Sequence, residues 1–184
     1  MLVRVEPEER AEPLERRSPP RVRIVQLTAR VFRALAEGDL AAANAASPVP
    51  LPAYFAGPEW RAVWHRRSRQ VVEDPASAAW VTGVIWDERQ QLAVGRAGYH
   101  GPPDRSGMVE IGYAVDPAWR RRGYALQRAA REPRVRTVRA TISPDNVASY
   151  QLVSQYGFTE TGEQWDDEDG LEIIYEVDAQ RYHA

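Results

Sequence analysis

The sequence predicts an α/β (α+β) fold in which helices flank a mixed β-sheet. Hydrophobic residues recur at helical spacing up to about residue 71 and at alternate positions in several later segments. The predicted elements run in the order helices, antiparallel strands, then strand, helix, strand, helix and two strands, which is typical of helices packed on a sheet. The length of 184 residues, with 43% hydrophobic and 27% charged residues, fits one globular domain.

The chain begins with a segment that lacks the composition of a folded element. Residues 1–20 combine proline, glutamate and arginine with few apolar positions, so we expect a flexible N-terminal arm and a single domain over residues 21–184. In "RVRIVQL", residues 21–27, arginine alternates with Val22 and Ile24, which predicts the first strand.

A helical region follows this strand. Thr28 is a suitable N-cap for a helix that ends near Gly38, and the alanine-rich segment 39–47 adds a short second helix. Pro58 suits the first turn of a longer helix. One side of that helix carries the stripe Trp60, Val63, Trp64, Arg67 and Val71. We interpret the stripe as a face packed in the core, and a ligand-lining role is the second alternative.

Segments between residues 80 and 115 predict antiparallel strands. Residues 80–87 and 91–100 flank the polar connection "ERQ" as a hairpin, and "MVEIGYAV", residues 108–115, is the next strand. One face of that strand carries Val109, Ile111, Tyr113 and Val115, and the other carries Met108, Glu110, Gly112 and Ala114. The second face sets a carboxylate beside two very small residues, which leaves room for a ligand against the backbone. A half-exposed strand with a solvated glutamate is the alternative.

The C-terminal part of the domain predicts two further helices among strands. The elements are a short helix (124–132), a strand (135–142), a second helix, and two strands (158–165 and 171–177). Pro133 ends the first helix. Ser143 is the expected cap of the second helix, with Pro144 in its first turn and Gly157 as its stop.

Several classes of site and location are excluded or disfavoured by composition. The chain has no cysteine, which excludes disulfides, thiolate metal sites and a cysteine nucleophile. His65, His100 and His183 show no ligand spacing, so we expect no metal site. No apolar run reaches the length of a membrane span, and the first 20 residues lack the apolar centre of a secretory signal, so we expect a cytoplasmic protein.

Charge is distributed unevenly along the chain. All 24 basic residues are arginine, and eight of them lie between Arg120 and Arg139 with one acid, Glu132. Nine acids and no base lie between Glu160 and Asp178. One region should therefore attract anions and the other cations. Either cluster alone is as typical of a solvated face, but the two together favour a site for two substrates.

The arginines at 120–122 stand where a predicted strand passes through a turn into a helix. Such a turn presents unpaired backbone N–H groups and the positive end of the helix to one point. Gly123 allows a bulky anion to approach the backbone, and Ala125 keeps the first turn open. Arginine adds charge-assisted bonds to phosphate oxygens. We predict that this turn binds a pyrophosphate.

Three motifs together resemble a known family. They are "RRRGYA", the preceding "VEIGYAVDPAW" and the following "RATISPDNVAS…YGF". The chain is similar to the GNAT superfamily of acyl-CoA-dependent N-acetyltransferases, and to its RimJ/RimL-like branch, which acetylates ribosomal proteins. The likeness is clear over 80–177 and looser over 21–79. It implies a mostly antiparallel sheet with a splayed strand pair, acetyl-CoA as donor, a primary amine as acceptor, no metal, and a homodimer.

The resemblance also implies roles for individual residues. The CoA pyrophosphate would be held by Arg120, Arg121, Arg122, Gly123, Tyr124 and Ala125. The pantetheine arm would pair with main-chain atoms of Ala114 and Val115 and with Asn146. Glu110 matches a base of the family, and Ser149 matches a serine that assists the departing thiolate. Many relatives use a tyrosine where this chain has Val153, and the helix after the pyrophosphate turn is shorter here than in the family.

These roles define a mechanism and its alternatives. A base is needed because amines are mostly protonated at neutral pH, and direct transfer in a ternary complex suits a chain without cysteine. The acidic turn Asp166–Asp169 would draw a cationic acceptor, either a protein N-terminus or a small amine. The first alternative is a non-catalytic acyl-CoA-binding protein. The second is a nucleic-acid-binding module that stacks bases on Trp119 and Tyr124, which the pI of about 6.0 disfavours.

Overall fold

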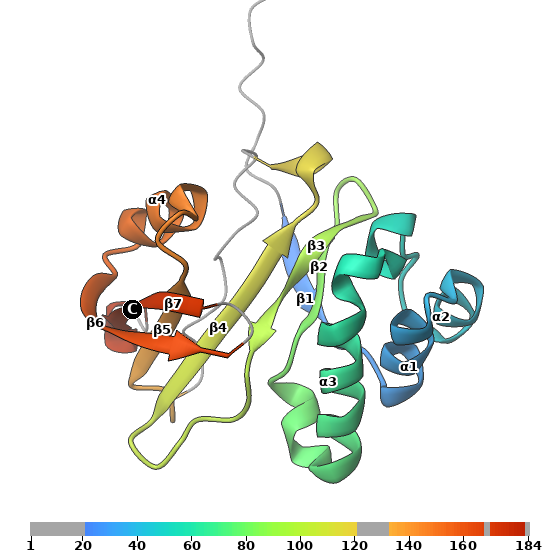
Figure 1. Cartoon of the computed structure of the whole chain (residues 1–184). Coiled ribbons are helices and arrows are strands. Elements are labelled where there is room, and N and C mark those ends of the chain that lie inside the picture. The colour runs from blue at the N-terminus through green and yellow to red at the C-terminus, as the bar shows by residue number, and fades with distance from the viewer. Residues whose placement is uncertain (1–20, 121–132, 168–169, 183–184) are drawn as a thin grey trace, which may run out of the picture.

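A computed structural model describes residues 21–120, 133–167 and 170–182 (Figure 1). Seven strands form one sheet in the order β1-β2-β3-β4-β5-β7-β6. Their bounds are β1 Val22–Val25, β2 Gly83–Asp87, β3 Leu92–Tyr99, β4 Met108–Val115, β5 Thr137–Ile142, β6 Thr159–Asp166 and β7 Gly170–Asp178. All neighbouring pairs are antiparallel except β4 and β5, which are parallel. The predicted mixed, mostly antiparallel sheet is confirmed.

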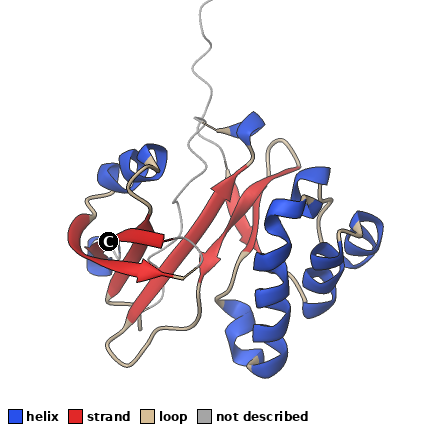
Figure 2. Ribbon diagram, in the orientation of Figure 1, coloured by secondary structure: helices blue, strands red, loops and turns tan. Residues whose placement is uncertain are grey.

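The helices divide between the two halves of the sheet. They are α1 Ala29–Glu37, α2 Leu40–Ala46, α3 Arg61–Glu73 and α4 Val147–Gln155. Figure 2 shows α1, α2 and α3 together beside β1–β4, and α4 beside β5–β7. The sheet is therefore covered by separate helical layers at its two ends, and the boundary between the halves falls at β4 and β5.

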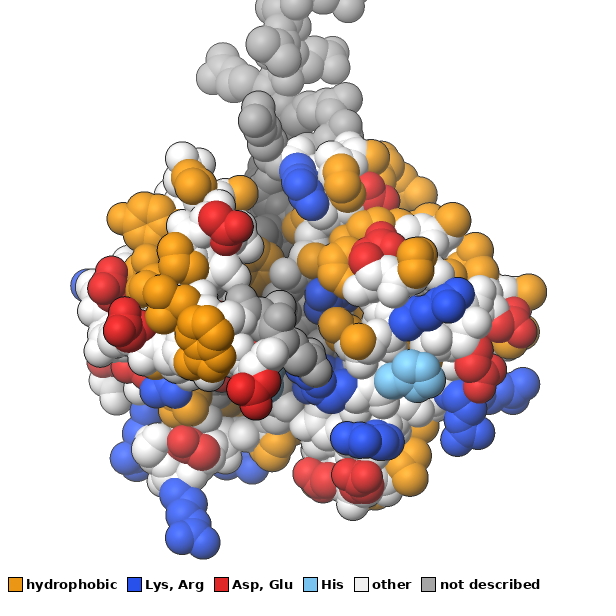
Figure 3. Space-filling model, viewed as in Figure 1, with side chains coloured by type: hydrophobic (Ala, Val, Ile, Leu, Met, Phe, Trp, Pro, Cys, Tyr) orange, Lys and Arg blue, Asp and Glu red, His pale blue; other side chains and the backbone are white. Residues whose placement is uncertain are grey.

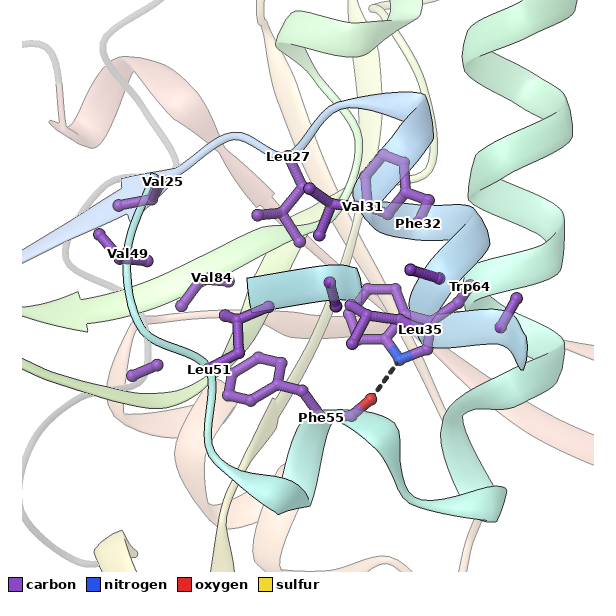
Figure 4. Packing of buried hydrophobic residues seen from close by; sticks show 14 of the residues in the cluster. Val25, Leu27, Val31, Phe32, Leu35, Val49, Leu51, Phe55, Trp64 and Val84 are labelled. Atoms are coloured by element: carbon purple, nitrogen blue, oxygen red, sulfur yellow. Dashed lines mark hydrogen bonds between the residues drawn. The ribbon is translucent and has the colours of Figure 1, made fainter. Parts of the chain in front are cut away.

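The larger core lies between α1, α3 and the first strands. Phe32, Leu35, Phe55 and Trp64 are fully buried there (Figure 4). The indole Nε1 of Trp64 donates a hydrogen bond to the carbonyl of Phe55 at 2.7 Å, which satisfies its only polar atom. The core interpretation of the α3 stripe is confirmed for Trp64, Arg67 and Val71, whereas Trp60 stays half-buried.

Local sequence signals place the ends of α1. Thr28 accepts a hydrogen bond from the N–H of Val31, and Gly38 adopts the left-handed conformation at φ +77°. Both predicted ends of this helix are confirmed. The 3₁₀ segments Ala53–Ala56 and Pro58–Trp60 then lead into α3, so Pro58 precedes the α-helix instead of lying in its first turn.

The cap of α4 differs from the prediction. Asn146, not Ser143, is the N-cap, and its side chain accepts from the N–H of Ser149 at 3.2 Å. Ser143 instead accepts from the N–H of Asn146 at 2.9 Å, in a turn with Pro144 at its second position. The helix therefore begins one turn later than expected and ends, as predicted, at Gly157 with φ +73°.

The remaining predictions on the fold have different outcomes. The hairpins β2–β3 and β6–β7 are confirmed, with ends shifted by a few residues. The N-terminal arm at 1–20 and the short helix at 124–132 lie outside the described residues. Within the described ranges, no helix combines the length and apolarity needed to cross a membrane.

Candidate functional site

The two halves of the sheet separate along β4. Its register with β5 covers Met108–Thr137, Val109–Val138 and Glu110–Arg139, while β5 continues to Ile142 against β7. Beyond Glu110 the edge of β4 therefore leaves β5, and the strands diverge (Figure 1). This is the splayed pair that the resemblance implies. We call the space beside this edge the β4 opening.

Main-chain groups of alternate β4 residues face the β4 opening. The N–H of His100 bonds to the carbonyl of Glu110, and the N–H of Asp116 bonds to the carbonyl of Val94. Because successive residues direct their main-chain groups to opposite edges, Ile111, Tyr113 and Val115 direct theirs toward the opening. Those of Ala114 point toward β3. Of the two predicted pantetheine contacts, Val115 thus has the main-chain direction that the role requires.

Glu110 lies where the β4 opening begins. The hydroxyl of Thr141 on β5 donates to its Oε1 at 2.7 Å, and Nδ1 of His100 lies 3.5 Å from the same oxygen. Arg139, which is opposite Glu110 in register, is directed to Glu176 through Nε at 2.9 Å and Nη2 at 2.7 Å. The Glu110 carboxylate is therefore oriented by a neutral hydroxyl, and its side chain remains 22% exposed.

A buried arginine fixes the backbone next to this carboxylate. Arg67 of α3 donates through Nε to Thr82 at 3.2 Å and through Nη1 to Gln70 at 2.7 Å and to the carbonyl of His100 at 3.2 Å. Gln70 donates to the same carbonyl at 2.7 Å. Burial lowers the pKa of Arg67 to about 10, which leaves it a cation at neutral pH. The network ties α3 to the end of β3 and sets the position of His100.

His100 is a site residue that sequence reasoning considered only as a metal ligand. Desolvation lowers its pKa below 6.5, and the opposing effect of Glu110 is smaller. A neutral imidazole therefore faces the carboxylate at pH 7. The side chain also covers Gly112, because a Cβ at that glycine would lie 3.1 Å from Nε2 of His100. The pair "YH" at the end of a predicted strand gave no sign of this contact.

The far side of the β4 opening is formed by α4. Tyr113 lies on the face of β4 opposite Glu110, and its hydroxyl is 3.5 Å from the carbonyl of Ser149. Burial raises the pKa of Tyr113, so its phenol keeps its proton. Val153 is fully buried in the second core. Glu110 and Ser149 thus lie on opposite sides of the opening, and Tyr113 is a second residue that sequence reasoning did not assign to the site.

The end of β4 leads toward the predicted phosphate turn. Arg120 is exposed, and its Nε donates to the carbonyl of Val115 at 3.1 Å. Arg121, Arg122, Gly123, Tyr124 and Ala125 lie outside the described residues, so their predicted contacts stay predictions. Among the described residues, the edge of β4 therefore leads to Arg120, the first arginine of the turn.

The acidic turn lies at the tip of the β6–β7 hairpin. Asp166 ends β6 and Asp167 follows it, while Glu168 and Asp169 lie outside the described residues. Trp165 beside them exposes 75% of its surface. In the described ranges, no three His, Asp or Glu side chains are grouped so that they could hold a metal ion.

Comparison with known proteins places this arrangement in a family. The acetyltransferase (GNAT) domain matches residues 30–159. The uncharacterized N-acetyltransferase YjdG of Bacillus subtilis is 33% identical over 95 residues, which are 48% of this chain and 56% of that protein. The match thus spans little more than half the length of that relative.

Solved structures share the fold at low sequence identity. RimJ of Mycobacterium smegmatis, in complex with CoA-disulfide, aligns with a TM-score of 0.53 at 17% identity, over 87% of this chain and 82% of that one. The spermidine/spermine N-acetyltransferase SpeG of Vibrio cholerae aligns with a TM-score of 0.57 at 13% identity, over 88% and 94%. Together with the family match, they lead to one conclusion: the chain belongs to the GNAT acetyltransferase family, whose members generally perform acetyl-CoA-dependent N-acetylation.

Proposed function

We propose that this protein transfers an acetyl group from acetyl-CoA directly to a primary amine, with Glu110 as the base. One observation carries the proposal: the pairing of β4 with β5 ends at Glu110. A carboxylate on one face of the strand and an unpaired strand edge therefore meet at the same point. This is the arrangement that an amine needs in order to lose a proton beside an acyl donor bound along that edge.

The residues present fit acetyl-CoA. Extended amide groups can pair with a free strand edge. Ile111, Tyr113 and Val115 direct their main-chain groups there, and the Val115 carbonyl already accepts from Nε of Arg120. Asn146 lies at the start of α4 on the far side, and Arg120 leads into the predicted pyrophosphate turn at 121–125. The bound cofactor would supply an acetyl group activated as a thioester.

Glu110 would take the proton from the acceptor amine. Amines are mostly protonated at neutral pH, so attack requires a base within reach. Thr141 holds one carboxylate oxygen at 2.7 Å and thereby orients the group. His100, which is neutral at this pH, lies 3.5 Å from the same oxygen. Once Glu110 has taken the proton from the amine, the imidazole can accept it from the carboxyl group and pass it to solvent.

On the other side of the opening, hydroxyl groups can protonate the leaving sulfur. Ser149 is the proposed donor, and the Tyr113 phenol lies beside its carbonyl. Because burial raises the Tyr113 pKa, this phenol is a protonated donor under assay conditions. Proteins of the same fold include a ribosomal-protein-S5-alanine acetyltransferase and spermidine acetyltransferases, so the acceptor is either a protein N-terminus or a small amine.

The experiment is a measurement of thiol release from acetyl-CoA across a panel of peptides and small amines. Glu110→Gln keeps the shape of the side chain and should lower kcat/KM by about 100-fold. The loss should be greatest at low pH, where the amine carries its proton most fully, and the affinity for CoA should be unchanged. Glu163→Gln, the same change at an exposed position of β6, is the matched control.

Two outcomes would contradict the proposal. An unchanged pH–rate profile in Glu110→Gln would show that another group is the base. Binding of CoA without thiol release for any amine would instead identify a non-catalytic acyl-CoA-binding protein.

A further inference from the structure

Three unpaired polar atoms lie on the α3 side of the sheet. Among the described residues, the buried side-chain polar atoms without a hydrogen-bond partner are the Tyr54 hydroxyl, Nε1 of Trp60 and Nε of Arg96. Native proteins rarely leave such atoms unpaired, because desolvating a donor without a partner is unfavourable. A set of them in one place is therefore a sign of a missing binding partner.

The three side chains form one cluster, which we call the Arg96 cluster. Cζ of Arg96 lies 4.3 Å from the ring centre of Trp60, and the rings of Trp60 and Tyr54 meet edge to face at 5.4 Å. Burial lowers the pKa of Arg96 and raises that of Tyr54, and each group partly offsets the shift of the other. The cluster thus holds a half-buried cation, with a buried Nε, beside two aromatic donors.

The chemistry of the unpaired atoms points to an acceptor ligand. An indole N–H and a guanidinium Nε–H can only donate, and a phenol hydroxyl can donate. A carboxylate satisfies several donors at once and forms its strongest hydrogen bonds with arginine. Asp116 and Glu59 both raise the pKa of Tyr54, but neither carboxylate forms a hydrogen bond with the three unpaired atoms.

The cluster shares a face of the sheet with the proposed base. Arg96 stands opposite Ala114 in register, and Ala114 lies four residues along β4 from Glu110 on the same face. Gly112 lies between them on this face and pairs with another glycine, Gly98, and the imidazole of His100 covers Gly112. A molecule that contacts both Glu110 and the cluster would therefore lie over this imidazole.

The surrounding charge disfavours a polycation. Arg66, Arg67 and Arg96 all act to lower the pKa of His100. Figure 3 shows several basic side chains on the lobe that contains α3, among acidic and hydrophobic ones. A polyamine would place several positive charges against these arginines. An amine that carries a carboxylate would instead place opposite charges at the two ends of the face.

We propose that the acceptor is an amino carboxylate, whose amine meets Glu110 and whose carboxylate binds the Arg96 cluster. The proposal rests on the proposed acetyltransferase function and names the substrate class for it. It assigns Tyr54, Trp60 and Arg96 as specificity residues that do not take part in the proton transfer.

The first test compares acceptors. Thiol release from acetyl-CoA is measured with α-amino acids and ω-amino carboxylates of increasing length, each against its carboxamide, and with spermidine. We expect the best carboxylate to exceed its carboxamide by about tenfold or more in kcat/KM. Equal or faster turnover of the carboxamide or of spermidine would overturn the proposal.

The second test removes the donors. Arg96→Gln should lower the ratio of kcat/KM for the carboxylate to kcat/KM for its carboxamide to about one, and Arg96→Lys should restore part of that ratio. Tyr54→Phe, which removes only the unpaired hydroxyl, should lower the preference a few-fold without loss of stability. Equal effects on both acceptors would indicate a purely structural role and would contradict the proposal.

Calorimetric binding separates this inference from the proposed function. Binding of an amino carboxylate that weakens in Arg96→Gln, without thiol release, would refute the acetyltransferase and leave the carboxylate site standing. Thiol release with no dependence on the carboxylate would support the acetyltransferase and refute the site. Neither binding nor turnover would refute both.

Discussion

The two sides of the β4 opening differ in how firmly their groups are held. On the α3 side, Arg67, His100 and Glu110 are joined by hydrogen bonds that connect α3, β3, β4 and β5. On the α4 side, Ser149 meets β4 through one long contact with Tyr113, at 3.5 Å. The proposed base is thus held in place by tertiary structure, whereas the proposed acid depends on a short helix. This contrast teaches that the proton-accepting half of the site should tolerate substitution least.

The largest expected effect concerns the network that holds the α3 side. Arg67→Met retains most of the buried volume but removes the donor to Thr82 and to the side-chain oxygen of Gln70, and it leaves the His100 carbonyl with only the Gln70 amide as donor. We expect the free energy of unfolding to fall by about 2–4 kcal/mol, measured by urea denaturation. The exposed neighbour Arg69→Met is the control and should change it by less than about 0.5 kcal/mol. Equal effects would show that the Arg67 hydrogen bonds add no stability.

The next prediction compares the two hydroxyls on the α4 side. Tyr113→Phe removes the phenol proton and should lower kcat by about tenfold if that proton reaches the leaving group. Ser149→Ala should have the larger effect if Ser149 is the donor. Single-turnover kinetics with saturating acetyl-CoA distinguish the two. If kcat is unchanged in both variants, the general acid does not lie on this side of the opening.

A smaller effect is expected where His100 covers β4. In Gly112→Ala the new Cβ would lie 3.1 Å from Nε2 of His100, so the imidazole has to shift. We expect a loss of a few-fold in kcat/KM with about 1 kcal/mol or less of stability. Gly162→Ala on β6, where the nearest atom is 4.0 Å away, is the matched control and should leave activity unchanged.

The smallest effect is the pH dependence of stability. The folded pKa of His100 lies below its unfolded value of about 6.5, so the unfolded chain binds more protons between those two values. The contribution of His100 is complete above pH 6.5 and is lost as the pH falls through the folded pKa. His100→Gln should reduce the pH dependence of the urea concentration at the midpoint of unfolding across this range. An identical pH profile in that variant would place the titration elsewhere.

The sequence could predict those features that depend on neighbouring residues. Thr28 and Gly38 mark the ends of α1 because capping is local, and the position of Glu110 on one face of β4 follows from alternation along one strand. Ser143 was the wrong cap because Asn146, three residues later, competes with the same chemistry and follows a proline turn.

Features that combine distant segments could not be predicted in this way. His100 meets Glu110 only through the register of β3 with β4, and Arg67 reaches the His100 carbonyl only because α3 packs across the end of β3. The Arg96 cluster needs two 3₁₀ segments, Ala53–Ala56 and Pro58–Trp60, and strand β3 to come together. Arginine in a helical stripe gave no indication that it would be buried and paired.

The short parallel seam between β4 and β5 has a thermodynamic consequence. Within the described residues, Met108, Val109 and Glu110 supply all the register pairs that join the two strands. A ligand bound along the free edge of β4 would add interactions between the two halves of the sheet that backbone hydrogen bonds do not supply. Occupancy and melting temperature should therefore rise together, so the heat resistance of this protein would follow the cofactor concentration around it.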